Sequence, residues 1–270
     1  MKKPTIKDVS RKSGFSISTV SRVMNGHYPV KEETKVKVLE AIKELNFNRN
    51  NVARNLRTQK SSLVALVVAD INNAYYSQIA KIIDDGLFGS GYNLLICNTD
   101  ESIEKENKVL KVLVEKGVDA IAISSVAKNI DEISALIRAG IKVVLLDRNP
   151  GIKDTPFVGS PDFDDSKLLT NYLIKHGHRK IALVAGTRQA TTSTLRLEGY
   201  RSALLDNHIQ FHSESIINAM FKKEEAYVKT KEFLKKNKNS HDPYTAIYST
   251  NNAMTIGVIQ AIQELGLKIP

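Results

Sequence analysis

Residues 5–25 read TIKDVSRKSGFSISTVSRVMN, and this stretch predicts two short helices joined by a turn at Gly14. Thr5 stands where it can cap the first helix, and Asp8, three residues later, is the reciprocal acid of a capping box. Ser16 is placed to cap the second helix in the same way. We therefore expect a compact helical pair at the start of the chain, and we interpret the other elements outward from it.

The second helix of this pair has two different faces. Val20, Val23 and Met24 fall at the three-and-four spacing of a buried stripe. The opposite face carries mostly short or hydrogen-bonding side chains, which would let a helix lie close against base edges in a DNA groove. The alternative is an ordinary helical hairpin with a solvated polar face. The DNA-contacting residues predicted in this segment are Thr5, Ser16, Ile17, Ser18, Ser21, Arg22 and Asn25.

A third helix is expected over residues 32–45, with Val38, Leu39, Ile42 and Leu45 on its inward side. Three helices are enough to enclose a minimal core. We therefore place a helix-turn-helix domain at residues 1–48.

The positive charge of the chain is concentrated near its start. The whole chain has 39 Lys and Arg against 29 Asp and Glu; residues 1–60 hold 14 against 5, so the other 210 hold 25 against 24. A cationic head on a nearly neutral body is typical of proteins that bind the phosphate backbone of a nucleic acid.

A linker is expected at residues 49–60. Its segment NNVARNLR has helical spacing, but eight residues are too few for a stable isolated helix, so we expect it to order against a partner. Leu56 between Arg54 and Arg57 suits a minor-groove wedge, in which the leucine opens a base step and the arginines meet the negative groove. The alternative is a flexible linker with an incidental leucine.

From Leu63 onward, short apolar strands alternate with amphipathic helices, which indicates α/β lobes with parallel sheets covered on both faces. We expect two similar lobes, at residues 61–158 and 159–270, with a ligand crevice between them beyond the carboxyl ends of the strands. Strands are predicted at 63–70, 92–99, 120–124, 142–147, 180–185, 215–218 and 246–249. Helices are predicted at about 77–89, 102–116, 130–139, 163–175, 195–206, 223–236 and 253–265.

Composition excludes several classes of protein. The single cysteine, Cys97, rules out a disulfide framework and fits packing in a reducing compartment. No apolar run is long enough to span a bilayer, and the start does not resemble a signal peptide, so we expect a cytoplasmic protein. No glycine pattern suits a cofactor loop, and neither Cys nor carboxylates complete a metal site around His176 and His178, so we expect no cofactor and no metal. The chain ends at Pro270 where another strand is expected, which suggests a C-terminally truncated form.

Several motifs in consistent order carry a family resemblance: TIKDVSRKSGFSISTVSRVMNG, NNVARNL, ALVVADINNAYYSQIAKIIDDG, LLICNTDE, KGVDAIAIS and KHGHRKIALVAG. Together they closely resemble the LacI/GalR family of bacterial transcription regulators. The resemblance covers essentially the whole chain. It implies a homodimer that binds a near-palindromic operator on double-stranded DNA, with a body like that of periplasmic sugar-binding proteins. It further implies a small effector, a sugar or sugar derivative, held between the lobes.

The resemblance also assigns residues. Ile17, Ser18 and Arg22 match base-contacting positions, and Leu56 matches the intercalating hinge leucine. Arg22 can pair bidentately with guanine, whereas Ile17 cannot hydrogen-bond and should favour a thymine methyl. The positions that resemble the effector pocket are Tyr75, Tyr76, Asp147, Arg148, Thr192, Arg196, Phe221 and Asn251.

Among these effector-pocket positions, Arg196 is the strongest candidate, because an arginine fork suits a carboxylate, a phosphate or a sugar diol. The alternative for Arg196 is an exposed helix arginine, and for the tyrosines it is ordinary core packing. The chain departs from the family at Arg49, where proline is usual, and at Ser160-Pro161, where Asp-Asn is common. The second departure removes a carboxylate that would receive sugar hydroxyls.

The function expected from these features is an effector-controlled, sequence-specific DNA-binding regulator, a repressor of a carbohydrate or related catabolic operon. The first alternative is a cytoplasmic small-molecule sensor without sequence-specific DNA binding, whose basic head contacts protein or membrane. The second is a doubly wound α/β enzyme, which the missing catalytic and cofactor motifs disfavour.

Overall fold

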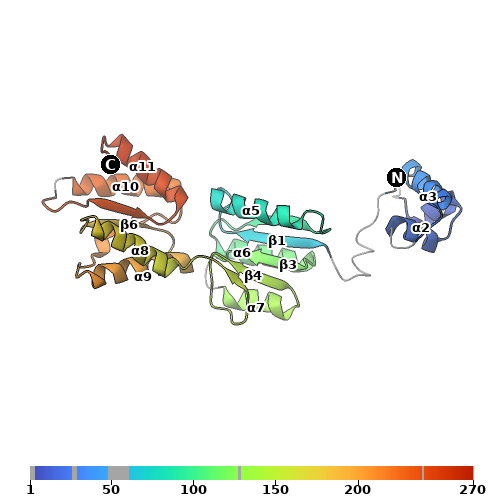
Figure 1. The fold of residues 1–270 in the computed structure, drawn as a ribbon, viewed down its shortest axis with the longest axis horizontal. Coiled ribbons are helices and arrows are strands. Elements are labelled where there is room, and N and C mark those ends of the chain that lie inside the picture. Colours follow the sequence, from blue (N-terminus) through green and yellow to red (C-terminus); the bar gives the residue numbers. More distant parts are fainter. Residues whose placement is uncertain (1–3, 26–28, 48–60, 127–128, 239, 270) are drawn as a thin grey trace. The chain divides into compact units, whose positions relative to one another are not determined.

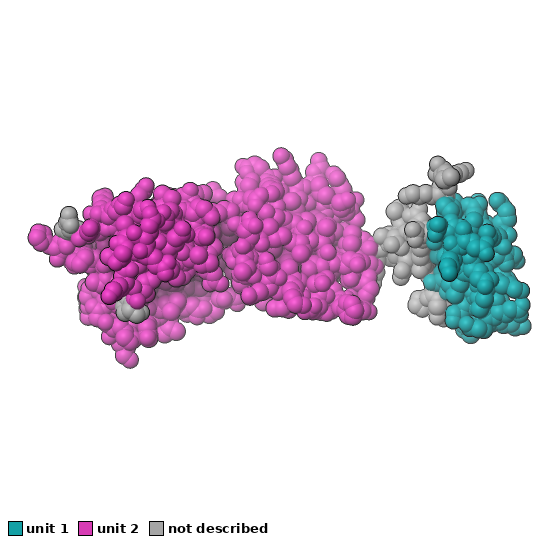
Figure 2. Space-filling model, turned by 90° about the horizontal axis from the view of Figure 1, so that it is seen from above, with its two compact units in different colours: residues 1–59 teal, residues 60–270 magenta. Residues whose placement is uncertain are grey.

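The structure is a computed structural model that describes residues 4–25, 29–47, 61–126, 129–238 and 240–269, without the side chain of Asn25. The chain forms two compact units, residues 1–59 and 60–270, which Figure 2 shows in different colours. We call them the head and the body. The predicted linker at residues 49–60, with Arg54, Leu56 and Arg57, lies outside the described residues.

The head contains the three predicted helices. The first ends at Gly14, whose φ of 76° closes the helix in the left-handed region that favours glycine. At its start, the Thr5 N–H donates to the Asp8 carboxylate at 2.9 Å, so the predicted capping interaction forms. The Thr19 N–H donates to Ser16 Oγ at 3.2 Å, which caps the second helix. The head helices are α1 (Ile6–Ser13), α2 (Ile17–Asn25) and α3 (Glu32–Glu44).

The core of the head is formed by Val9, Val20, Val38 and Ala41, all buried. The prediction that Leu39 also faces inward was wrong, because its side chain is 47% exposed. On α3 the inward positions follow the spacing 38, 41, 42 and 45, and residue 39 lies about 100° around the helix from residue 38. The small side chain of Ala41 fills the place that the larger leucine was expected to take.

The first lobe of the body is a five-stranded sheet in the order β2-β1-β3-β4-β5, and each adjacent pair is parallel (Figure 1). The parallel sheet predicted for this lobe is therefore confirmed. Its strands are β1 (Leu63–Val68), β2 (Asn93–Asn98), β3 (Ala120–Ile123), β4 (Lys142–Leu146) and β5 (Phe157–Val158). Its helices are α5 (Ala74–Leu87), α6 (Ile103–Glu115) and α7 (Ile130–Arg138).

The second lobe has a three-stranded parallel sheet in the order β7-β6-β8. Helices α8 and α9 pack on one face of this sheet, and α10 and α11 pack on the other. The strands are β6 (Ile181–Ala185), β7 (Ile216–Asn218) and β8 (Ala246–Ser249). The helices are α8 (Asp162–Lys175), α9 (Thr191–Asp206), the 3-10 turn η1 (Ser213–Ser215), α10 (Lys223–Asn237) and α11 (Asn252–Glu264).

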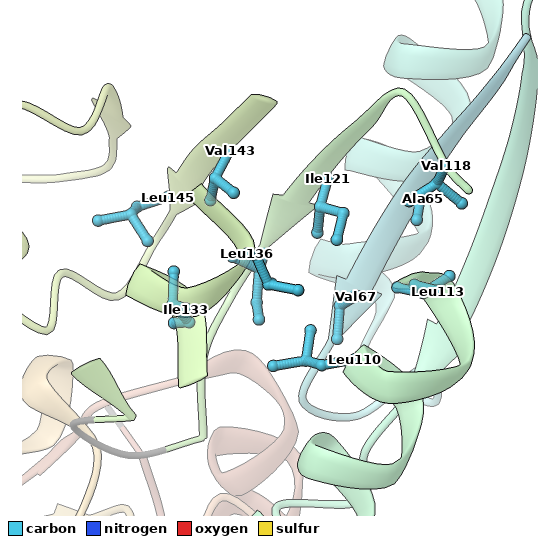
Figure 3. Packing of buried hydrophobic residues seen from close by; sticks show 11 residues of the cluster. Ala65, Val67, Leu110, Leu113, Val118, Ile121, Ile133, Leu136, Val143 and Leu145 are labelled. Carbon is cyan, nitrogen blue, oxygen red and sulfur yellow. The ribbon is translucent and has the colours of Figure 1, made fainter. Parts of the chain in front are cut away.

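Strand β1 lies inside the sheet, between β2 and β3, and this position explains why its sequence is apolar without interruption. Ala65 and Val67 face α6 and α7, where they meet Leu110 and Leu113 in the cluster of Figure 3. Leu66 and the other alternate positions face α5. Because successive strand residues point to opposite faces, a strand covered on both sides must be apolar at every position.

Two helices begin three or four residues earlier than predicted. Helix α5 starts at Ala74 because the Asn73 side chain accepts the Tyr75 N–H at 3.1 Å and caps it. Helix α9 starts at Thr191, so the polar run before Leu195 is helical. Both extensions carry side chains into the site described below.

Helices α8 and α9 approach each other closely at Gly199. A Cβ added there would lie 2.2 Å from the Phe163 carbonyl oxygen, which is backbone and cannot move aside cheaply. We expect Gly199→Ala to lower the free energy of unfolding of the body by about 1 to 3 kcal/mol, through overpacking. The matched control is Gly86→Ala, since a Cβ on Gly86 of α5 meets nothing within 4 Å. This control should be neutral or up to about 1 kcal/mol more stable. Urea unfolding followed by circular dichroism measures both, and equal midpoints would contradict the packing argument.

Candidate functional site

The face of α2 that sequence reasoning assigned to DNA is largely open. Ile17 is 44% exposed, Ser18 and Arg22 are exposed, and Ser21 is half-buried. Val20, about 160° around the helix from both Ser18 and Arg22, is fully buried. The helix therefore has an apolar side that fixes it in the head and a mixed side available to a groove.

Two further predicted contact residues use their hydroxyls within the head. The Thr5 hydroxyl donates to the Asp8 carboxylate at 2.7 Å. Ser16 Oγ lies 2.8 Å from Ser18 Oγ and is also the cap of α2. These interactions fix the helix starts, and the DNA contacts of both residues stay predictions. The side chain of Asn25 lies outside the described part.

The body contains a cavity of about 180 Å³ between its two lobes. It is lined by all eight residues that resemble the effector pocket: Tyr75, Tyr76, Asp147, Arg148, Thr192, Arg196, Phe221 and Asn251. Each follows the carboxyl end of a strand or stands at the start of the next helix, which is where open parallel sheets bind ligands. The structure thus brings together residues that are up to 176 positions apart in the chain.

Six further residues line this cavity and were not predicted. They include two carboxylates, Asp70 after β1 and Glu101 after β2. Asp70 is the last residue of the strand predicted at 63–70, and Glu101 stands two residues after the strand predicted at 92–99, so both lie at the strand ends where open parallel sheets bind ligands. The full set is Asp70, Asn73, Glu101, Ser160, Thr250 and Asn252.

Asp147 presents a carboxylate to the cavity from an unusual backbone turn. Its φ is 61°, and the Arg148 N–H donates back to Leu146 O at 2.5 Å, which closes a three-residue turn around it. The Tyr76 hydroxyl donates to Asp147 Oδ2 at 3.3 Å. Burial of the Tyr75 hydroxyl, with the negative charge of Asp147 second, raises the pKa of that phenol to about 12, so it remains a hydrogen-bond donor at neutral pH.

Arg148 is buried and held by Glu101. Its Nη1 and Nη2 donate to the two oxygens of that carboxylate at 2.9 and 2.6 Å. Burial opposes the charge of the guanidinium, but the bonds to Glu101 favour it, and the pKa of Arg148 is raised. The Nε of Arg148 is buried without a hydrogen-bond partner; Asp147 Oδ2, at 3.8 Å, lies beyond bonding distance.

Arg196 faces the same cavity from α9. Its Nε donates to Asp162 Oδ1 at 2.8 Å and its Nη1 to the Thr250 carbonyl oxygen at 2.6 Å. Burial raises the pKa of Asp162, and the pairing with Arg196 opposes that rise. Ser160, where the family commonly has an aspartate, also lines the cavity. Asp162, two residues later, supplies a carboxylate close to that position and holds Arg196.

Two interactions join the lobes across the cavity. Lys222, after β7, donates to Asp70 Oδ2, after β1, at 2.7 Å. The guanidinium of Arg148 lies 5.1 Å from the centroid of the Phe221 ring, a cation–π contact between the lobes. Both would be lost if the lobes moved apart.

The site is therefore suited to binding a polar small molecule. It offers acceptors at Asp147, donors at Arg196 and Tyr75, and aromatic surfaces at Tyr75 and Phe221. Within the described ranges, no group of three or more His, Cys, Asp or Glu side chains could hold a metal ion. Nor does any helix there have the length and apolar character that crossing a membrane requires.

Two family models match the chain. Residues 61–270 match the model described as periplasmic binding proteins and sugar binding domain of LacI family, and residues 5–50 match bacterial regulatory proteins, lacI family. Among curated proteins, the chain is 32% identical over 267 residues to the HTH-type transcriptional repressor PurR of Pasteurella multocida (strain Pm70), covering 98% of this chain and 79% of that protein. It is 31% identical to the ribose operon repressor of Halalkalibacterium halodurans, covering 98% and 77%.

Solved structures agree with these matches. A lac repressor dimer bound to operator and the anti-inducer ONPF aligns with a TM-score of 0.80 at 25% identity, covering 99% of this chain and 80% of that one. A transcriptional regulator CelR–cellobiose complex aligns at 0.68, also with 25% identity and coverages of 99% and 80%. The similarity therefore extends over head and body together.

Proposed function

The chain belongs to the lacI family of bacterial regulatory proteins, and from this premise we propose that it is an effector-responsive, sequence-specific DNA-binding repressor. The observation that carries the proposal is the combination, in one chain, of a head with an open recognition helix and a body with a polar cavity between two lobes. Neither part alone would distinguish a regulator from a simple DNA-binding or ligand-binding protein.

The head would bind operator DNA through α2. We assign base contacts to Ile17, Ser18, Ser21, Arg22 and Asn25, support to Thr5 and Ser16, and the minor-groove wedge to Arg54, Leu56 and Arg57. Arg22 is the residue most able to read a base, because a guanidinium can donate twice to guanine. A lacI-family relative of known structure is a dimer bound to operator, and we propose a homodimer on a near-palindromic site for this chain too.

The body would bind the effector through the eight cavity residues named above. Effector binding would favour one arrangement of the two lobes. It would thereby change the fraction of molecules in which the linker can bind DNA. The contacts between Lys222 and Asp70 and between Arg148 and Phe221 are those that such a movement would make or break.

We place the protein in the cytoplasm and assign it no catalytic activity, and we propose a carbohydrate or related catabolic operon as its target.

The experiment that tests this function is selection of bound sequences from a random duplex pool, repeated with a metabolite mixture. We expect enrichment of a near-palindromic site and a change in its retention when the effector is present. Binding should also fall steeply with salt on a log-log plot, because phosphate contacts release counterions. A sensor whose head binds protein or membrane would show neither enrichment nor a steep slope, and equal retention of scrambled duplexes would overturn the proposal.

Replacing Leu56 by alanine tests the proposed wedge. Removing a buried leucine from a base step should weaken operator binding about ten- to 150-fold, because about 1.5 to 3 kcal/mol of apolar burial is lost. Effector binding should not change, because Leu56 stands in the linker and the cavity is in the body. Fluorescence anisotropy with labelled operator and calorimetry with effector measure the two quantities. Unchanged operator affinity would contradict the proposal that Leu56 inserts into a base step of the operator.

A further inference from the structure

The second lobe contains a pocket of about 330 Å³ that is lined by residues of α9 and of the edge strand β7. We call it the α9–β7 pocket. It includes Ala185 and Asn218, the last residues of β6 and β7, so it lies at the edge of the sheet where parallel strands end and ligands bind. Among the described residues, none lines both this pocket and the cavity between the lobes. It is therefore a separate candidate site.

Helix α9 contributes to both pockets from different sides. Thr192 and Arg196 line the cavity between the lobes. Ser193, Leu197 and Arg201, spaced four apart, line the α9–β7 pocket and therefore share one side of the helix. Arg201 stands nine residues after Thr192, about half a turn around the helix from it. Substitutions in the α9–β7 pocket can thus be made without removing a side chain from the other cavity.

The α9–β7 pocket holds two cations and one acid, all unpaired. Arg188, Arg201 and Glu198 are exposed, and within the described residues no ion pair or side-chain hydrogen bond involves any of them. In the cavity between the lobes, by contrast, Arg148 and Arg196 each hold a carboxylate. The pocket on α9 and β7 therefore has an excess of positive charge that its own side chains do not neutralise.

The Arg201 guanidinium is positioned without using its hydrogen-bond donors. Its Cζ lies 4.2 Å from the centroid of the Phe211 ring, a cation–π contact that covers one face of the guanidinium. A stacked guanidinium still presents the N–H groups along its edge, in the fork that fits a carboxylate or a phosphate. The turn that carries Arg188 is tied to α9, because the Thr194 hydroxyl donates to the Arg188 carbonyl oxygen at 3.4 Å. Both arginines thus stand on an ordered framework.

A buried hydroxyl in the wall of the pocket also lacks a partner. Ser193 lines the pocket and is only 5% exposed. In the part of the chain that the structure describes, its Oγ takes part in no hydrogen bond. Because buried hydroxyls are normally hydrogen-bonded, an unpartnered one in a pocket wall indicates a polar group of a ligand.

The rest of the wall is largely apolar. Leu197, Phe211 and Ile216 contribute side chains to it, and Ala185 adds a methyl group. A bare inorganic ion would leave this surface uncovered, whereas a ligand with an apolar part would bury it. The volume of about 330 Å³ falls at the lower end of the roughly 300–1,000 Å³ of small-molecule sites. The pocket therefore suits a compact ligand with a charged end and an apolar end.

We propose that the α9–β7 pocket binds a small organic anion, whose carboxylate or phosphate is held by Arg188 and Arg201 and whose apolar part packs against Leu197 and Ile216. The Ser193 hydroxyl donates a further hydrogen bond to the anion. This inference goes beyond the proposed function and does not depend on it, because neither the operator nor the effector enters the argument. The protein then has two small-molecule sites of different chemistry.

The test is calorimetric titration of the full-length protein with benzoate, phenyl phosphate, inorganic phosphate and benzyl alcohol. We expect benzoate or phenyl phosphate to bind, and the tighter of the two identifies the charged group. Inorganic phosphate has no apolar part and benzyl alcohol has no charge, so each should bind at least about tenfold more weakly. Binding of neither organic anion, or equally tight binding of either control compound, would overturn the proposal.

Three variants place the anion in this pocket. Arg188→Gln and Arg201→Gln should each lower its affinity at least about tenfold, because a hydrogen bond between charged groups is lost. Glu198→Gln removes the opposing charge and should raise the affinity about two- to fivefold. The matched control is Arg138→Gln, which removes a positive charge from an exposed position on α7 in the first lobe and should leave the affinity unchanged.

Wild-type affinity in a folded arginine variant would place the anion elsewhere and overturn the proposal. Unchanged or lower affinity in Glu198→Gln would overturn it too, since the charge in the pocket would then not govern binding. Arg201 packs on Phe211, so circular dichroism checks its variant; if Arg201→Gln does not fold, Arg188→Gln and Glu198→Gln decide. The operator selection is independent: a protein that selects a site but binds neither organic anion fails this inference alone.

Discussion

Replacing Arg22 by alanine is expected to weaken binding to the selected operator by about 1 to 3 kcal/mol, or about five- to 150-fold, and to relax the preference for guanine at one position in each half-site. Arg22 is exposed on the face of α2 opposite the buried Val20, so its truncation leaves the core of the head intact. Fluorescence anisotropy with the selected site and a scrambled duplex, at one salt concentration, gives the specific and non-specific affinities separately.

The matched control is Lys37→Ala on α3. Lys37 is exposed and pairs with Glu33 on its own helix at 2.9 Å, so this change removes the same charge from another part of the head. It should affect both duplexes equally and weakly. Should Arg22→Ala also weaken the scrambled duplex by the same factor as the selected one, the arginine contacts phosphate and reads no base.

Replacing Arg148 by methionine is expected to lower the free energy of unfolding of the body by about 3 to 5 kcal/mol, because it leaves the Glu101 carboxylate largely buried without its partner. The cation–π contact with Phe221 is lost as well. Urea unfolding followed by far-ultraviolet circular dichroism measures the change. Replacing both partners, Arg148→Met with Glu101→Leu, should recover most of the loss, because no buried charge then remains unpaired.

Arg138→Met is the control for this experiment. Arg138 is exposed in the last turn of α7, where a substitution should change stability by no more than about 0.5 kcal/mol. If Arg148→Met and Arg138→Met unfold at the same urea concentration, the Glu101–Arg148 pair contributes nothing to the stability of the body.

Local patterns in the sequence predicted most elements correctly. The capping residues Thr5 and Ser16 and the turn at Gly14 place the first two helices, because caps and left-handed turns depend on neighbours within four residues. The strands of the body were found for a similar reason, since continuous apolar runs of five or six residues mark strands covered on both faces.

The predictions that failed concern residues whose structure depends on contacts between different helices or strands. Leu39 was expected in the head core, but Ala41 is buried there instead, and Leu39 lies on the exposed side of α3. The two-residue strand β5 went unnoticed because Phe157 and Val158 are too short a run to show alternation, and only pairing with β4 makes them a strand.

The sequence by itself determined the three-helix head, the two α/β lobes and, through the family resemblance, eight residues that line one cavity. Only the tertiary structure decided how the charges of that cavity are matched. Glu101 and Arg148 are 47 residues apart, and Asp162 and Arg196 are 34 apart. The pairing of each cation with an acid depends on distances of a few ångströms between the ends of different strands. Because Coulomb interactions weaken with distance and only the fold sets these distances, no periodic pattern in the sequence predicts the pairs.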